Sequence, residues 1–197
     1  MRIGTAVAAA LLVTATTAGT AHAATITAQT ATLTYSCTYP GVSPQNSTFA
    51  GSFTTADTVS PGAAITLTDV HLDHVMSPAV RSLFTAAGYD EVQGSFGATI
   101  TAANATPASA VISGGIPLQV VPTTGGLAFP ENAGPLTFTA GTAGSAGFAL
   151  GLQVTENLQW HRKGTGTGTW TAWSSTCTLR ITNPAQDSRF QPGITIS

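Results

Sequence analysis

Residues 148–160 read FALGLQVTENLQW, the longest regular hydrophobic pattern in the chain. Because successive side chains of an extended strand point to opposite faces, this pattern predicts a strand with one buried face. The predicted inner face carries Phe148, Leu150, Leu152, Val154, Glu156, Leu158 and Trp160. Glu156 is the one polar residue of this series, and it indicates a bulge, a strand end or an inward carboxylate.

Shorter alternating runs, rich in Thr, Val, Ile and aromatic residues, lie on both sides of this segment. Gly, Pro, Asn and Asp separate them at a spacing that is typical of a β-sandwich or a closed barrel. We predict a mainly β fold, an antiparallel Ig-like β-sandwich with one short α-helix. The other strands are expected at residues 31–37, 49–53, 64–72, 91–102, 108–112, 116–121, 136–140 and 169–181.

The helix is predicted over residues 78–87. Ser77 can cap it, Pro78 suits the first helical position, and Gly88 can end it in a left-handed conformation. The residues at helical spacing that should pack on the strands are Val80, Leu83, Phe84 and Ala87. The Gly- and Pro-rich residues 122–135 are predicted to form a loop.

The first 23 residues have the three parts of a secretory signal peptide. Arg2 stands near the start, residues 6–13 are apolar, and Ala21 and Ala23 have the spacing of a cleavage site. Threonines interrupt the second half of this stretch, which makes it unsuited to span a membrane. We therefore expect cleavage of residues 1–23 and one secreted, extracellular domain at residues 24–197, not held in a membrane.

The composition narrows the choice of partners. Charged residues make up 7% of the chain, and the formal net charge is −2. Nucleic-acid binding depends on many Lys and Arg contacts, and six basic residues are too few for it. The Gly-x-Gly-x-Gly stretch at residues 164–168 lacks the strand-then-helix context of a dinucleotide site, and we predict no cofactor.

Cys37 and Cys177 are the two cysteines of the sequence. In an exported protein they predict one disulfide between the first and last strands, with Cα atoms about 4.4–6.8 Å apart. A reactive thiol or a metal pair is the alternative, but no Cys-x-x-Cys motif or neighbouring histidine supports it.

Several short motifs occur in a distinctive order. They are residues 33–40 (LTYSCTYP), a turn at Pro61-Gly62, Val121-Pro122 ahead of Gly125-Gly126, and residues 174–179 around Cys177. This order resembles a family of actinobacterial secreted domains of unknown function, over about residues 31–190. The resemblance implies a secreted, β-sandwich-like domain and assigns no catalytic residue.

His71, Asp73 and His74 are the densest group of metal-ligating side chains in the sequence. In a strand His71 and Asp73 share one face and His74 takes the other, so a metal ion would need a turn and a further ligand. We predict no metal and keep these three residues as alternative candidates. The adjacent carboxylates Asp90 and Glu91 are predicted to be solvated turn residues.

Residues 161–170 predict a flexible hairpin loop. Trp160 and Trp173 are expected in the core, whereas Trp170 should lie on the surface, and Arg162, Lys163 and Trp170 are the candidate binding surface. We therefore expect a non-enzymatic binding or interaction module at the cell envelope or in an extracellular assembly. Its partner would be an extracellular protein or a cell-wall glycan; the alternative is a secreted hydrolase or metal-dependent enzyme.

Overall fold

The computed structural model describes residues 23–163 and 168–197, so the predicted signal peptide lies outside the described residues except for Ala23. The described chain is mainly β with antiparallel pairing and one helix, α1 (Pro78–Ala86), as predicted. The strands are β1 (Thr25–Gln29), β2 (Leu33–Tyr39), β3 (Val42–Ala56), β4 (Thr58–Val59), β5 (Ala64–Met76), β6 (Tyr89–Ala103), β7 (Ala105–Thr106), β8 (Ser109–Val120), β9 (Leu127–Ala133), β10 (Leu136–Ala140), β11 (Gly144–Arg162), β12 (Thr169–Leu179) and β13 (Ile194–Ile196).

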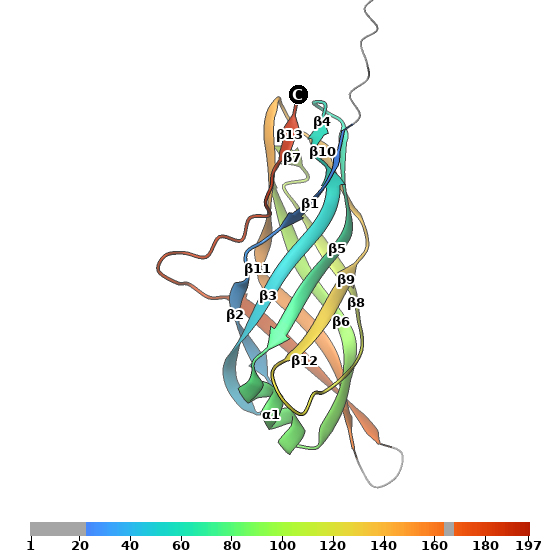
Figure 1. The fold of residues 1–197 in the computed structure, drawn as a ribbon, viewed down its shortest axis with the longest axis vertical. Coiled ribbons are helices and arrows are strands. Elements are labelled where there is room, and N and C mark those ends of the chain that lie inside the picture. Colours follow the sequence, from blue (N-terminus) through green and yellow to red (C-terminus); the bar gives the residue numbers. More distant parts are fainter. Residues whose placement is uncertain (1–22, 164–167) are drawn as a thin grey trace, which may run out of the picture.

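Among the described residues, eight strands pair in a closed ring, in the order β3, β2, β12, β11, β6, β8, β9, β5 and back to β3. An immunoglobulin sandwich has two separate sheets, whereas here β3 pairs with both β2 and β5 and joins the two sides. Opposite walls of this closed sheet face each other across one core, as the two sheets of a sandwich do. In this respect the fold is sandwich-like, as predicted. Figure 1 shows the strands running obliquely along an elongated molecule, with α1 at one end and the C-terminus at the other.

One irregularity in β5 decides which face of this strand is buried. Ile65 and Leu67 point inward, but Asp69 has a positive φ of 49° and the β3–β5 register shifts beside it. A single extra residue exchanges the two faces of a strand. Beyond Asp69 the buried residues are therefore the even-numbered ones, Val70, Leu72, His74 and Met76.

A second irregularity lies in β11, the strand predicted most clearly from the sequence. Between Leu150 and Val154 the pairing with β6 shifts, and β11 has two more residues than β6 over this interval. The extra residues bulge outward, so Leu152 is 70% exposed, and its predicted place in the core is wrong. Because two residues are added, the alternation is preserved, and Glu156 remains on the inner face.

Helix α1 forms as predicted. Its N-cap Ser77 accepts a hydrogen bond from the Val80 amide at 3.3 Å, and Gly88 has a φ of 85° after its end. Val80 and Phe84 are buried, but Leu83 is 47% exposed and Ala87 is also exposed, which corrects the predicted stripe. Arg81 takes part in the packing instead, since its Nε donates to the Gly125 carbonyl at 2.9 Å.

The predicted disulfide between Cys37 and Cys177 is present. It joins β2 and β12, which β1 precedes and β13 follows, so these are not the first and last strands. The two cysteines are register partners, and their Cα atoms are 3.9 Å apart, closer than predicted. The bond therefore cross-links neighbouring strands within the closed sheet.

Two further predictions about strands need correction. The expected loop at residues 122–135 contains β9, which pairs with β5 and β8. The two strands expected at residues 108–112 and 116–121 are the single strand β8.

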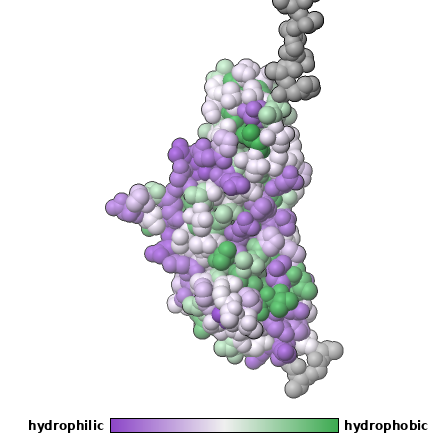
Figure 2. Space-filling model, in the orientation of Figure 1, coloured by the Kyte–Doolittle hydropathy of each residue, from purple (hydrophilic) through white to green (hydrophobic). Residues whose placement is uncertain are grey.

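The described residues contain no helix with the length and apolar character needed to cross a membrane. The face in Figure 2 is mostly hydrophilic or neutral, and hydrophobic residues gather in patches toward the α1 end.

Candidate functional site

The candidate binding surface lies at the end of the β11–β12 hairpin. Arg162, Lys163 and Trp170 are exposed, and 42% of the Trp170 surface is accessible to solvent. Residues 164–167, part of the predicted hairpin loop, lie outside the described residues. Trp160 is buried as predicted, and Trp173 is partly buried and packs against the core.

Trp170 lies against a histidine that a carboxylate holds in place. The rings of His161 and Trp170 have centroids 5.2 Å apart, and His161 Nδ1 lies 2.6 Å from Asp90 Oδ1. Asp90 and Glu91 belong to β6 and face this histidine, so the prediction that they are turn residues is wrong. We call Asp90, His161 and Trp170 the hairpin patch.

Beside the hairpin patch, the outer face of β6, β11 and β12 carries rows of uncharged polar side chains. Register pairing places Gln93 beside Gln159, and Ser95, Asn157 and Ser174 form the next row. Thr155 and Thr176 follow in the third row. We call these seven exposed residues, Gln93, Ser95, Thr155, Asn157, Gln159, Ser174 and Thr176, the polar strip.

The structure separates the three metal candidates suggested by the sequence. His71 and Asp73 share the outer face of β5, where His71 Nε2 lies 3.4 Å from Asp73 Oδ2. His74 points into the core and is fully buried. The three residues therefore do not converge on one point.

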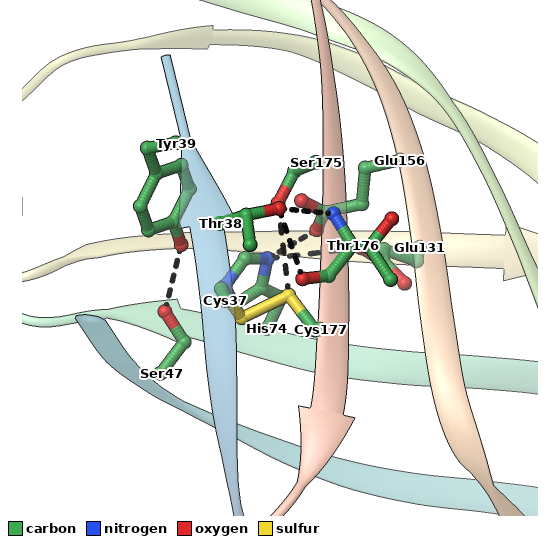
Figure 3. The surroundings of a disulfide bond; sticks show 10 residues. All are labelled: Cys37, Thr38, Tyr39, Ser47, His74, Glu131, Glu156, Ser175, Thr176 and Cys177. Carbon is green, nitrogen blue, oxygen red and sulfur yellow. Dashed lines mark hydrogen bonds and ion pairs between the residues drawn. A yellow bond between two sulfur atoms is a disulfide. The ribbon is translucent and has the colours of Figure 1, made fainter. Parts of the chain in front are cut away.

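His74 instead belongs to a buried cluster with two glutamates. Its Nδ1 lies 2.5 Å from Glu156 Oε1 and 3.7 Å from Glu131 Oε1. The residues come from β5, β9 and β11, and Figure 3 shows them close together beside the disulfide. We call His74, Glu131 and Glu156 the core triad.

Aromatic packing fixes the orientation of the histidine ring. Phe49 stacks on it with a centroid distance of 4.2 Å, and Phe129 meets it edge-on at 4.6 Å. With both contacts in place, rotation of the ring away from the glutamates would open a gap in the core.

The two carboxyl groups of the core triad have opposite pKa shifts. Burial, together with the charge of Glu156, raises the pKa of Glu131 to about 11. Burial also disfavours the charge on Glu156, but attraction to His74 outweighs it and lowers the pKa of Glu156 below its usual range. The triad thus holds one ionised and one protonated carboxyl at neutral pH, in a position that solvent does not reach.

Sequence reasoning left the inward carboxylate of Glu156 as one of three interpretations, and it missed Glu131. The signal that would have placed Glu131 on an inner face is its spacing of two from Phe129 and of four from Leu127. These three residues are buried, and the residues between them are exposed or half-buried. Pro130 obscured this pattern, because proline within a run argues against a central strand.

The sequence model of a family of unknown function, DUF6801, matches residues 34–191. No curated protein and no solved structure matches the chain.

Proposed function

The chain belongs to the DUF6801 family of unknown function, and we propose that it is a secreted, non-enzymatic binding module for an extracellular glycan. One observation carries the proposal: Trp170 is exposed at the end of the polar strip, next to a histidine that Asp90 holds. An indole face in a fixed position offers an apolar surface to the C–H groups of a sugar ring.

The polar strip supplies matching hydrogen-bonding groups. Gln and Asn amides and Ser and Thr hydroxyls both donate and accept, as sugar hydroxyls do, and none of them carries a charge. The strip runs along three adjacent strands from the hairpin patch, so its groups lie in rows. An extended neutral polysaccharide fits such a surface better than a strongly charged partner.

Arg162 and Lys163 supply two basic groups at the same end of the surface. They would add attraction to acidic substituents of a cell-wall glycan, although exposed charges of this kind contribute little to affinity. This mode of binding supports action at the cell envelope or in an extracellular assembly, after removal of residues 1–23.

The burial of the core triad gives no support to the enzymatic alternative. His74, Glu131 and Glu156 are at most 1% exposed, so an external substrate cannot touch them. A secreted hydrolase would need its acid and base within hydrogen-bonding reach of the scissile bond.

The test measures retention of residues 24–197 on insoluble cell-wall glycan, with soluble oligosaccharides as competitors. Trp170→Ala should weaken binding by about tenfold or more, the usual effect of removing a central aromatic contact. Gln159→Ala should weaken it by a smaller factor. Ile181→Ala is the matched control, because this side chain is 99% exposed and follows the opposite end of β12.

Circular dichroism would establish that each variant is folded. If folded Trp170→Ala binds the glycan as well as the parent protein, or if the parent is not retained, the proposed function is wrong.

A further inference from the structure

The core triad contains six buried polar atoms whose bonding is incomplete. Among the described residues, neither nitrogen of His74 and no carboxylate oxygen of Glu131 or Glu156 has a hydrogen-bond partner. The 2.5 Å contact between His74 Nδ1 and Glu156 Oε1 is short but lacks the angle of a hydrogen bond. Buried polar groups in proteins are nearly always satisfied, so such a concentration requires an explanation.

We propose that His74, Glu131 and Glu156 bind one divalent transition-metal ion, such as Zn²⁺, inside the closed sheet. One ligand atom from each residue lies within 4.8 Å of the other two. One imidazole and two carboxylates form a donor set that suits Zn²⁺ and related first-row ions. This site differs from the group His71, Asp73 and His74 that the sequence suggested, and it is independent of the proposed glycan surface.

The distances are close to those that a shared ion requires. Ligand atoms about 2.0–2.2 Å from a tetrahedral ion lie roughly 3.3–3.6 Å from one another. The 3.7 Å separation of His74 and Glu131 is near this range, and Glu156 would need to retreat by about 1 Å. Phe49 and Phe129 pack against the imidazole, whose Nδ1 lies near both glutamates.

Charge balance also favours a divalent ion. As metal ligands, the imidazole and two ionised carboxylates together carry two negative charges, so the ion would take the place of the proton that Glu131 holds without a metal. A divalent cation reduces the net charge to zero and gives both carboxylates a partner. No other described basic side chain pairs with either glutamate.

The placement of the ligands gives the ion a structural role. β5 and β9 are neighbours, whereas β11 lies across the core in the opposite wall of the ring. An ion held by all three strands would link the two walls. Because the triad is fully enclosed, the ion would enter while the chain folds, as structural metals commonly do.

The experiment unfolds residues 24–197 in urea with EDTA and refolds separate samples with Zn²⁺, Co²⁺ or Mn²⁺, or with none. After gel filtration, metal content is measured by mass spectrometry. We expect about one ion per chain in the parent protein and at least tenfold less in Glu131→Gln and Glu156→Gln. His71→Ala is the control, because it alters the outer face of the same strand, and it should retain the ion.

Bound Co²⁺ gives a second readout through its visible absorption, which reports coordination by nitrogen and oxygen. If the Gln variants do not fold, the test is X-ray absorption spectroscopy of the metal-loaded parent protein. A spectrum that shows an imidazole and carboxylate oxygens around the ion supports the proposal. A parent that refolds to its native circular dichroism spectrum and takes up none of the three ions overturns it. A folded Gln variant that still binds one ion per chain also overturns the proposal.

Discussion

Glu156 Oε1 lies 2.5 Å from His74 Nδ1, although the two residues belong to opposite walls of the closed sheet. Two strand irregularities determine that both side chains face the core. The positive φ at Asp69 turns His74 inward, and the two added residues in β11 keep Glu156 on the inner face. The shorter of the two contacts that His74 makes with buried glutamates therefore depends on strand bulges, which are common beside functional sites.

Removing one partner of this contact should destabilise the folded protein. In EDTA, Glu156→Ala should lower the free energy of unfolding by about 3–5 kcal/mol, because it leaves buried polar partners uncompensated. Urea denaturation at neutral pH measures the change. A triple variant, His74→Phe with Glu131→Met and Glu156→Met, should lose much less, since apolar groups of similar size replace the whole cluster. Equal losses in the two variants would show that pairing is not the source of the stability.

The Cys37–Cys177 disulfide closes a loop with a sequence separation of 140. Replacing both cysteines with Ala should reduce the free energy of unfolding by up to about 5 kcal/mol, because the unfolded chain regains the entropy of that loop. Reduction of the parent protein should have the same effect in urea denaturation. A double variant as stable as the oxidised parent would contradict this expectation.

Local patterns were enough to predict much of the fold. The alternation at residues 148–160, the capped helix after Ser77 and the cysteine pair each depend on nearby residues or on composition, and all three correspond to observed features. The closure of the sheet could not be predicted in the same way. It depends on the registers at which β3 pairs with β5 and β8 pairs with β9, and no local sequence pattern marks these registers.

The core triad was harder to predict than the fold. A regular strand through residues 65–73 would bury His71 and Asp73, and the positive φ at Asp69 reverses this. Glu131 lies in a segment whose glycines and prolines indicated a loop. The exposure of Trp170, in contrast, followed directly from its alternation with Trp173.

Adjacent glycines at the β8–β9 contact should respond very differently to substitution. A Cβ at Gly114 would overlap the backbone of Asn132, whereas one at Gly115 has nothing within 4 Å. Gly114→Ala should therefore destabilise by about 1–3 kcal/mol or more, because β8 and β9 share only two register pairs and cannot easily separate without opening the ring. Gly115→Ala should stay within about 0.5 kcal/mol of the parent in thermal or urea unfolding. Similar effects at both positions would show that this close approach does not hold the ring closed.

The Tyr35 hydroxyl predicts how stability changes in alkali. It is buried and donates to the Gly151 carbonyl at 2.8 Å, and burial raises the pKa of Tyr35 well above its usual value. The folded state thus holds this proton more tightly than the unfolded chain, so the contribution of Tyr35 is complete below about pH 10 and declines as the pH rises further.

Tyr35→Phe should cost about 0.5–1.5 kcal/mol at pH 8, where only the hydrogen bond is lost. At pH 11 the parent protein should have lost about 1.4 kcal/mol through Tyr35 that the variant cannot lose, so the difference should shrink or reverse. Urea denaturation at the two pH values, with tyrosinate absorbance followed through the transition, measures both effects. Leu152→Ala, an exposed change on the outward bulge, should leave the pH dependence as it is in the parent. If the cost of Tyr35→Phe is equal at pH 8 and pH 11, the hydroxyl ionises in the folded protein as it does in water, and the bulge at Gly151 does not shield it.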